Sequence, residues 1–541
     1  MSLVSNITTV SQVLSPQPSA RPGPLTPQKA ITCMLLAMVL WRFWRFTISP
    51  FLHPERPREF PYWIPFVSPD GVYLGHARAF FRDSNGLLSR ARHYLGNTKD
   101  PIALTAFGMT FYVVTQAKHS AEVYRNTETL SFEDFVQGLM RTNGNNEDVI
   151  QIMYSALPIE KSGFPNPQGE SLGVLAQKMH THQLHPGNNL VLLQKQVHAR
   201  IDHLLRLDTL RKVCTYASSQ SPTYIELPLY QWCSDYFIRL GQHVYFGETL
   251  DQIDPTLADS FLIFDELIWK MLYQYPEFLS HDMSKPRAQI ITSLKKYFQV
   301  PQIKRSGSTA WLINAMEDEM RALGVDEDNL AVLIFHLYFA INTNTRKTAF
   351  WLLTYLLHNP TLLAAYRQET EPAFSGRNLV DPFYIQDPVN CPQVDNIWHE
   401  TLRMSGWSAS VRLITQDTTI GGKLMRKGNR VIVPHRLLHF DESIFGESPN
   451  VFRPERWQKE NLARSPSWRP FGAGKTMCSG RFLARFSVTT FVATLLQRFD
   501  VEMVGNPPMP QADEGKPVLG IMSIKKGQDF KVRLSPREKL R

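Results

Sequence analysis

The stretch SWRPFGAGKTMCSGRFLARF, residues 467–486, decides how the rest of the chain is interpreted. It places one cysteine, Cys478, between glycines and directly before a segment with the apolar spacing of a helix. A thiol in this position can be an inert core residue, half of a disulfide, a zinc ligand, or an electron-rich ligand of a larger group. The remaining sequence has to distinguish these four roles.

The chain contains five cysteines: Cys33, Cys214, Cys233, Cys391 and Cys478. Their number is odd, they are widely spaced, and none forms a C-x-x-C pair. This pattern argues against a disulfide framework and against a closed zinc site. The sequence therefore predicts a protein of reducing surroundings.

The composition is that of an ordinary globular protein, with 43% hydrophobic and 20% charged residues. The length of 541 residues suggests about three domains, unless one large cofactor organises a single core. The net charge of +9 is spread along the chain without a long basic run, so a nucleic-acid partner is not expected. A dispersed basic excess suits an acidic protein partner or an anionic membrane surface.

The N-terminal region predicts a membrane anchor. Residues 1–28 are polar, rich in Ser and Pro, and expected to be disordered, and KAITCMLLAMVLWRFWRFTISPFL follows them. We expect residues 29–49 to cross a bilayer, which takes about 20 residues, with Arg42 and Arg45 reaching the headgroups. More basic residues follow the span than precede it, which places the C-terminal part in the cytosol. An amphipathic helix on the membrane surface and a core helix are the alternatives.

Six prolines between residues 50 and 69 predict a stiff, extended stalk without a regular element. The body, residues 70–541, is predicted to be one catalytic domain, mainly α with small β-sheets, because helical apolar spacing dominates it. Hairpins are predicted at residues 101–115, at residues 418–434 with Gly428 as a turn residue, and at residues 520–534.

The longest predicted helix covers residues 328–359. It is apolar almost all round, so it must lie inside the body. Its one polar interruption is NTNT, residues 342–345. A polar run on a buried helix predicts that these side chains face a partner in the interior that interacts with polar groups.

Three motifs occur in a fixed order along the C-terminal third of the chain. HETLR places Glu400 and Arg403 where they can pair on one helix face. FRPERW, residues 452–457, follows and contributes Arg456. The third motif is Phe471-x-x-Gly474-x-x-x-Cys478-x-Gly480. A lone E-x-x-R is noise, but the three together and in this order are specific.

On these motifs the chain resembles the cytochrome P-450 family of haem-thiolate enzymes, over nearly everything after the stalk. The resemblance implies a triangular, helix-rich body with haem b (iron protoporphyrin IX) between the long central helix and the helix after the cysteine. It makes Cys478 the axial iron ligand, a role that suits a cysteine at a helix start because the helix dipole favours thiolate. Phe471, Gly472 and Gly480 would contact the cofactor, since glycines let the backbone approach a flat ring closely.

The resemblance also assigns residues outside the cysteine loop. A buried charged network would brace that loop and take no part in the chemistry; its members are Glu400, Arg403 and Arg456. Arg412 matches a position that usually holds a haem propionate. His180, or alternatively His182, would pair with the other propionate.

Two departures from the family pattern matter. The family often has Arg or His two positions before the cysteine, where this chain has Thr476, and the neighbouring Lys475 would have to compensate. The long helix usually carries an acid–alcohol pair that helps to deliver protons to bound dioxygen, and here Thr343 and Asn344 take those places. In this segment the chain resembles the branch that contains sterol 7α-hydroxylases and prostacyclin synthase.

The departure in the long helix bears on catalysis. An amide can donate a hydrogen bond to an oxygen, but it is a poor proton relay. We expect Asn344 and Thr345 to be catalytic. The alternative is that Asn344 only kinks the helix.

The expected function is oxidation, chiefly hydroxylation, of a bulky lipophilic molecule of terpenoid or sterol type with O2. Electrons would come from NADPH through a flavoprotein reductase, in the endoplasmic reticulum membrane, with a single span and the catalytic domain in the cytosol. Two alternatives stay open: a haem-thiolate isomerase or dehydratase that needs no reductase, and a non-catalytic haem sensor. The substrate pocket is predicted to contain Ala340, Ser408, Ala409, Ser410, Ile521 and Met522.

Overall fold

A computed structural model describes residues 26–62, 75–106, 108–158, 164–305, 307–458, 462–515 and 517–537. Contacts between residues divide the chain into two compact units, the first ending at His53 and the second beginning at Pro54. Most of the predicted disordered tail, up to residue 25, lies outside the described residues. So does the part of the predicted stalk from residue 63 onward.

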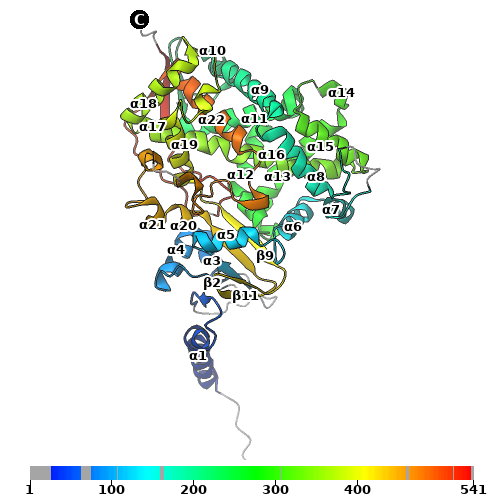
Figure 1. The fold of residues 1–541 in the computed structure, drawn as a ribbon, viewed down its shortest axis with the longest axis vertical. Helices are drawn as coiled ribbons and strands as arrows, with labels where there is room; N and C mark the ends of the chain where they lie inside the picture. Colours follow the sequence, from blue (N-terminus) through cyan, green and yellow to red (C-terminus); the bar gives the residue numbers. More distant parts are fainter. Residues whose placement is uncertain are drawn as a thin grey trace, which may run out of the picture. The chain divides into compact units, whose positions relative to one another are not determined.

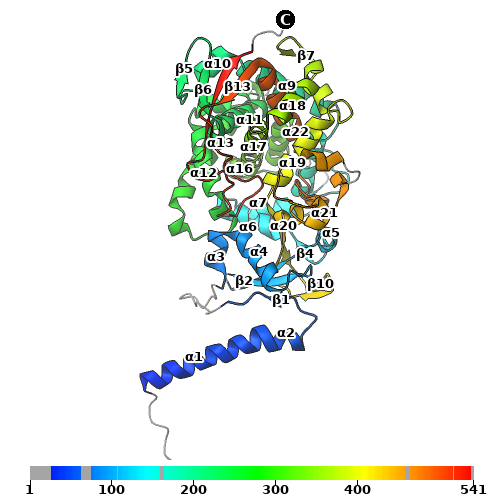
Figure 2. The same cartoon turned by 90° about the vertical axis from the view of Figure 1, so that its left-hand side faces the viewer.

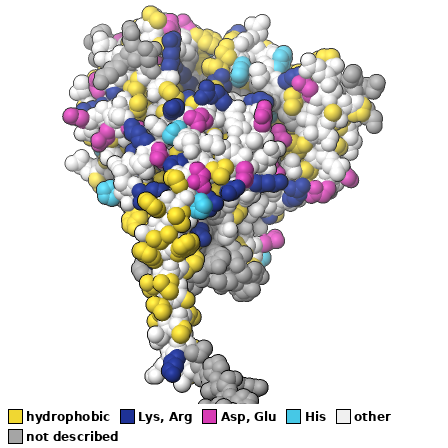
Figure 3. Space-filling model, turned by 60° about the horizontal axis from the view of Figure 1, so that its bottom comes forward, with side chains coloured by type: hydrophobic (Ala, Val, Ile, Leu, Met, Phe, Trp, Pro, Cys, Tyr) yellow, Lys and Arg dark blue, Asp and Glu magenta, His cyan; other side chains and the backbone are white. Residues whose placement is uncertain are grey.

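The N-terminal unit is a continuous helix of 26 residues, Pro27–Leu52. It consists of α1 (Pro27–Phe43), a π-helical turn (Trp44–Ile48) and α2 (Ser49–Leu52). By length and composition it can cross a membrane, and none of its most apolar stretch is buried. Hydrophobic side chains cover it (Figure 3). The helix runs past the predicted anchor, residues 29–49, into what the sequence predicted as the start of the stalk.

The second unit is rich in helices. Those that surround its centre are α8 (Leu172–Leu184), α9 (Asn188–Leu204), α11 (Leu229–Ile253), α12 (Leu257–Leu272), α13 (His281–Gln299), α15 (Trp311–Ala322), α16 (Glu327–Thr343), α17 (Thr345–Leu357), α18 (Pro360–Thr370), α19 (Pro392–Ser405) and α22 (Arg481–Arg498) (Figure 1). The shorter helices are α3 (Ala77–Arg82), α4 (Ser84–Tyr94), α5 (Ala117–Arg125), α6 (Glu133–Asn143), α7 (Glu147–Tyr154), α10 (Leu207–Val213), α14 (Gln302–Arg305), α20 (His435–His439) and α21 (Glu442–Phe445).

The strands form two larger sheets and two small hairpins. The six-stranded sheet has the order β1 (Arg58–Glu59), β2 (Ile102–Ala106), β3 (Met109–Val113), β12 (Arg430–Pro434), β9 (Ala409–Ile414), β4 (Leu130–Ser131). The four-stranded sheet has the order β13 (Phe499–Met503), β14 (Lys531–Pro536), β6 (Ile225–Pro228), β5 (Ser219–Gln220). The hairpins are β7 (Phe374–Ser375) with β8 (Asn378–Leu379), and β10 (Thr418–Ile420) with β11 (Lys423–Met425). The two sheets lie at opposite ends of the second unit (Figure 2).

The first predicted hairpin is confirmed. β2 and β3 pair in antiparallel register, with Ile102 opposite Val113, and Gly108 between them has a φ of 72° that suits glycine. In the predicted stalk, however, Arg58 and Glu59 pair with β2 as β1. The prediction of no regular element was wrong there because Pro57 and Pro61 flank these residues, which leaves their N–H groups free to pair.

The other two hairpin predictions need correction. In residues 418–434 the hairpin turn is at Gly421 and Gly422, between β10 and β11, while Gly428 lies in the loop that leads to β12. Residues 520–534 do not form a hairpin, because β14 pairs with β13 and β6, and Ile521 bridges to Gly406. An alternating sequence predicts a strand but not its partner, which long-range packing selects.

The long helix predicted at residues 328–359 is broken at one residue. α16 ends at Thr343, α17 begins at Thr345, and Asn344 between them has φ −103° and ψ −41°. The expected burial is observed, since most side chains of both helices are buried in the main core with those of α11, α19 and α22. The break therefore lies in the interior and not at the surface.

Candidate active site

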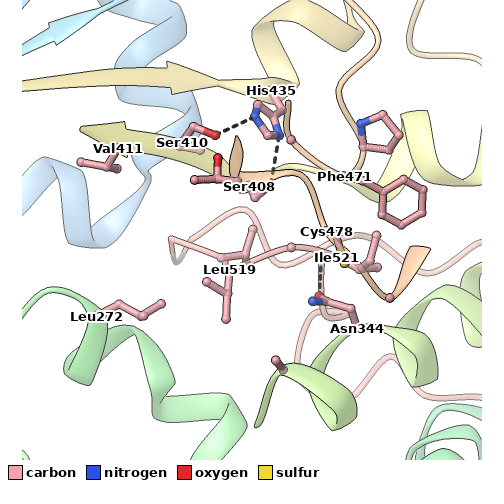
Figure 4. Close-up of a pocket in the computed structure, with 18 of the residues that line it drawn as sticks. Leu272, Asn344, Ser408, Ser410, Val411, His435, Phe471, Cys478, Leu519 and Ile521 are labelled. Carbon is pink, nitrogen blue, oxygen red and sulfur yellow. Dashed lines mark hydrogen bonds between the residues drawn. The ribbon is translucent and has the colours of Figure 1, made fainter. Parts of the chain in front are cut away.

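One cavity of the body has a volume of about 1050 Å³ and contains Cys478 in its wall. Its walls come from the cysteine loop, from α16 and α17 around the helix break, from β9, and from the segment Val518–Ile521 (Figure 4). The end of α12 and the loop after it close another side. Most of the lining side chains are apolar, including Phe237, Leu272, Val411 and Leu519.

The cysteine loop folds around two glycines with left-handed backbones. Gly472 has φ 74° and Gly474 φ 62°, and a Cβ on Gly474 would lie 3.1 Å from the carbonyl oxygen of Tyr124. The Cys478 N–H then donates to the Phe471 carbonyl oxygen at 3.0 Å, and α22 begins at Arg481. Phe471, Gly472, Cys478 and Gly480 all line the cavity, as expected for cofactor contacts. With no Cβ on two of these four residues, the wall is open to a flat ligand.

The Cys478 side chain is accessible, but from the cavity, with protein atoms around the rest of it. Burial raises the pKa of the thiol, while the backbone N–H groups of Gly480 and Arg481 and the Arg481 charge act in the opposite direction. The groups at the helix start thus favour the thiolate, in the direction expected from the sequence, while desolvation opposes it. A thiolate at this position needs a cation facing it from the cavity.

Within the described ranges, no group of three or more His, Cys, Asp or Glu side chains is arranged to hold a metal ion. A metal bound to Cys478 would have to bring most of its other ligands with it. A porphyrin supplies four such ligands in one plane. The cavity volume, the glycine-lined wall and the single thiol therefore fit haem.

A buried charged network lies behind the loop. Glu400 accepts from Arg403 at 2.7 and 2.8 Å, from Arg456 Nε at 2.9 Å, and from the indole N–H of Trp457 at 2.8 Å. The remaining donors of Arg403 reach the carbonyl oxygens of His439 and Pro449. Both carboxylate oxygens of Glu400 therefore accept hydrogen bonds. A buried charged network stabilises a fold only when its polar atoms are paired in this way. Trp457 was not singled out from the sequence, although it is the last letter of FRPERW.

Arg412 lies beside the cysteine loop. Its Nη2 donates to Thr476 Oγ1 at 2.6 Å, its Nη1 donates to the Val411 carbonyl oxygen at 2.8 Å, and its guanidinium lies 4.8 Å from the ring centre of Phe132. Arg412 and Thr476 both line the cavity. Lys475 is exposed and does not line it, so it does not compensate for the missing cation at position 476.

The sequence did not predict the polar cluster next to Arg412. His435 shares hydrogen bonds with Ser408 Oγ at 3.1 Å through Nδ1, and with Tyr124 Oη at 3.0 Å and Ser410 Oγ at 3.3 Å through Nε2 (Figure 4). Burial, with the charges of Arg469 and Arg412, lowers the pKa of His435 to about 4. The imidazole is therefore neutral near pH 7 in this environment.

The two histidines considered for a propionate lie apart from this cluster. His180 lines the cavity from α8, its Nδ1 is 2.6 Å from the Ala176 carbonyl oxygen, and burial lowers its pKa. His182 is exposed, bonds to Asn189, and does not line the cavity. Of the two, only His180 faces the cavity, and its contact with its own helix leaves one ring nitrogen available.

The helix break is fixed by a contact far away in sequence. Asn344 Oδ1 accepts from the Ile521 N–H at 2.9 Å, and the Thr348 hydroxyl donates to the Asn344 carbonyl oxygen at 3.0 Å (Figure 4). A Cβ on Gly520 would lie 2.2 Å from Asn344 Oδ1, so only glycine allows this approach. Because the oxygen faces the backbone, the amide nitrogen is the atom left for the cavity.

The cavity brings together five of the six residues predicted for the substrate pocket, Ala340, Ser408, Ala409, Ser410 and Ile521, with the two residues predicted to be catalytic, Asn344 and Thr345. The prediction that Met522 belongs to the substrate pocket was wrong. It is fully buried, does not line the cavity, and its backbone accepts from the Trp351 indole. Successive side chains of an extended segment point to opposite sides, so Ile521 and Met522 cannot both face the cavity.

Residues 217–532 match the family model for cytochrome P450. The chain belongs to the cytochrome P450 family. It is 24% identical to the cytochrome P450 monooxygenase poxD of Penicillium oxalicum, over 88% of this chain and 93% of that protein. It is 23% identical to the 7-alpha-hydroxycholest-4-en-3-one 12-alpha-hydroxylase of Oryctolagus cuniculus, over 93% of this chain and 98% of that protein. It is also 25% identical to the cholesterol 7-alpha-monooxygenase of Cricetulus griseus, over 58% of this chain and 68% of that protein.

These matches confirm three expectations from the sequence. The fold is that of a P450, the resemblance extends to the sterol-hydroxylase branch, and the protein is an oxidoreductase of the monooxygenase family. Membership implies haem as the prosthetic group and a redox partner as the electron source. The N-terminal helix is consistent with attachment to a membrane.

Proposed function

We propose that this P450 hydroxylates a bulky, polycyclic lipid of sterol or terpenoid type. The observation that carries the proposal is the large apolar cavity with Cys478 in its wall. A cavity of about 1050 Å³ has room for haem together with a lipid. The sterol substrates in the names of two relatives point in the same direction.

Haem b would be held by Cys478 as axial ligand, with Phe471, Gly472 and Gly480 against the ring. Bound there, the haem iron supplies activation of dioxygen, by which one oxygen atom enters a C–H bond of the substrate and the other leaves as water. Arg412 would pair with a haem carboxylate. His180 remains a candidate for the second carboxylate because it faces the cavity.

The substrate side of the cavity is assigned to apolar residues of three segments. Leu272, Val411 and Leu519 come from α12, β9 and the segment before Ile521 (Figure 4). They exclude water and contact a hydrocarbon skeleton without specifying polar groups. Orientation then depends on the few polar side chains of the wall.

Asn344 is the polar residue best placed to orient a substrate. Its oxygen is occupied by the Ile521 N–H, so it presents N–H donors to the cavity. A carboxamide does not exchange protons near pH 7, so its role would be to donate a hydrogen bond to a substrate oxygen or a water. Thr345, the next residue in the chain, also lines the cavity, and its hydroxyl group would transfer the proton.

Electrons would come from NADPH through a membrane-bound flavoprotein reductase, for which the net charge of +9 provides a general attraction to an acidic partner. The helix Pro27–Leu52 would anchor the protein in the endoplasmic reticulum membrane with a single span. Arg42 and Arg45 follow most of the apolar stretch, which favours a cytosolic catalytic body.

The test is turnover of sterols and terpenoids by the purified full-length protein, with and without a P450 reductase and NADPH. The proposal predicts a product with one added oxygen only when reductase, NADPH and O2 are all present. Conversion of an oxygenated substrate without reductase would replace it with the isomerase or dehydratase alternative, which the missing acid at Thr343 favours. Bound haem without turnover of any member of the panel in either condition would contradict both.

A further inference from the structure

Arg430 is a cation in the cavity wall without an acidic partner. It is the first residue of β12 and lines the cavity. Its side chain is half-buried, and its Nε is buried without a hydrogen-bond partner. Within the ranges that the structure describes, its guanidinium forms no ion pair with a carboxylate. Because a half-buried cation without a counterion costs free energy, this position suits an anionic group that enters the cavity.

The register of the sheet places Arg430 on the side of the cavity assigned to the substrate. Arg430 lies opposite Phe111 of β3 and Leu413 of β9, and both of these residues line the cavity. Residues in register share a face of a sheet, whereas successive residues of one strand point to opposite faces. Arg430 therefore shares its face with Leu413 and Val411. Arg412 points to the other face, toward the cysteine loop.

Arg430 is also distant from the cysteine loop along the sheet. β12 runs from Arg430 to Pro434, which directly precedes His435 in the polar cluster. These four steps along a strand span about 13 Å. Figure 4 shows Val411, on the neighbouring strand, and Cys478 at opposite sides of the cavity. A molecule bound to Arg430 can therefore extend along the sheet toward Cys478.

Few other charges face Arg430. Besides Arg412, the lining contains two further charged residues in the described part of the chain, Arg78 and Asp134, and both are exposed to solvent. Asp134 and Tyr273 are near enough to act on Arg430 electrostatically, while burial lowers the pKa of Arg430. Three arginines and one aspartate give the lining a positive balance. This balance favours an anionic ligand over a cationic one.

We propose that Arg430 binds a carboxylate of the substrate, which is then a polycyclic lipid acid. The inference rests on the proposed function, because the skeleton of that lipid occupies the apolar wall. Arginine suits the role, since its planar fork donates two parallel hydrogen bonds to a carboxylate. With the acid held at Arg430, the opposite end of the skeleton lies nearest to Cys478. Arg430 thus determines which carbon atoms are oxidised.

The experiment measures ligand binding by equilibrium dialysis of the full-length holoenzyme in detergent, with the ligand quantified by mass spectrometry. The probes are two matched pairs, lithocholic acid with its methyl ester and abietic acid with its methyl ester. The variants are Arg430→Met and Arg430→Lys. The control is Arg426→Met, which removes an exposed guanidinium that pairs with Asp417 and does not line the cavity. Urea unfolding of each protein is measured in parallel.

We expect the wild type to bind at least one acid more tightly than its ester. Arg430→Met should bind that acid about tenfold more weakly, the factor for one charge-assisted hydrogen bond, and should bind the ester as the wild type does. Arg430→Lys should fall between them, since it keeps the charge but not the fork geometry. Arg426→Met should match the wild type. The urea midpoint of Arg430→Met should not fall, because the substitution removes a half-buried cation without a partner.

Equal binding of acid and ester by the wild type would overturn the inference. So would a lower urea midpoint of Arg430→Met with unchanged acid binding, because the arginine would then serve the fold. If Arg430→Met does not fold, the ratio of acid to ester binding in Arg430→Lys decides. Failure of the proposed function is distinct: a wild type that binds none of the four probes would contradict a polycyclic lipid substrate, whereas tight binding of the esters alone would remove only the role of Arg430.

Discussion

The side-chain oxygen of Asn344 accepts a hydrogen bond of 2.9 Å from the backbone N–H of Ile521, a residue 177 positions further along the chain. This one contact joins the break between α16 and α17 to the segment Val518–Ile521, which forms an adjoining part of the cavity wall. It also decides which end of the amide faces the cavity. This hydrogen bond therefore influences both the shape of the cavity and the polarity of its wall.

Replacing Gly520 by alanine should disturb this contact directly. The new Cβ would lie 2.2 Å from Asn344 Oδ1, so the segment must move away from the helix break. We expect a loss of stability of about 1–3 kcal/mol, typical of overpacking, measured by urea unfolding. Gly307→Ala is the control, because a Cβ there meets nothing within 4 Å. Equal stability of the Gly520 variant and the wild type would show that the contact is not tight.

Replacing Asn344 tests whether its amide handles oxygen chemistry. Asn344→Ala removes both the contact with Ile521 and the donor to the cavity, whereas Asn344→Asp keeps an oxygen for the Ile521 N–H. If the donor matters, both variants should produce less product per NADPH consumed. The measurement compares product, NADPH and hydrogen peroxide in one reaction. Wild-type coupling in both variants would leave Asn344 a structural residue.

Neutralising Glu400 should destabilise the body strongly. Glu400→Gln leaves Arg403 and Arg456 buried without a counter-charge, which typically costs about 3–5 kcal/mol. Haem content should fall as well, because the network lies behind the cysteine loop. Glu147→Gln removes an exposed partner of Arg141 and should leave the unfolding free energy nearly unchanged. Similar effects of the two substitutions would contradict a bracing role.

Acid should weaken the fold partly through His336. Burial lowers its pKa from 6.5 to about 4, and the ring lies between the Val332 carbonyl oxygen at 2.8 Å and Asn143 Nδ2 at 3.1 Å. Because the unfolded chain binds the proton more tightly, stability from this group is complete above pH 6.5. It is lost as the pH falls toward 4.

The corresponding measurement is urea unfolding at pH 7 and pH 5. The wild type should lose about 2 kcal/mol more than His336→Gln between these values, since glutamine does not titrate. The exposed His182, changed to Gln, provides the control and should keep the wild-type difference. The same pH dependence in wild type and His336→Gln would show that the ring is already solvated in the folded protein.

The sequence was sufficient for features whose determinants are local. Glu400 and Arg403 are three residues apart on one helix, so their pairing follows from helix geometry. The β2–β3 hairpin follows from alternating residues around Gly108, and the N-terminal helix from an apolar run that only Arg42 and Arg45 interrupt. In each case the neighbours in space are also neighbours in sequence.

Features set by distant contacts were missed. The break at Asn344 depends on the Ile521 N–H and on the absence of a side chain at Gly520. The β14 strand takes partners from two other segments, which a local alternation cannot specify. The hydrogen bond between Tyr124 and His435 joins residues 311 positions apart.

The most direct test of the account is the absorption spectrum of the reduced carbon monoxide complex of Cys478→Ala. The wild type and the control Cys391→Ala, which removes a fully buried thiol outside the cavity, should both show the red-shifted Soret band of a thiolate ligand. Cys478→Ala should lose that band. An unchanged thiolate band in Cys478→Ala would mean that another residue binds the iron, and would contradict the account.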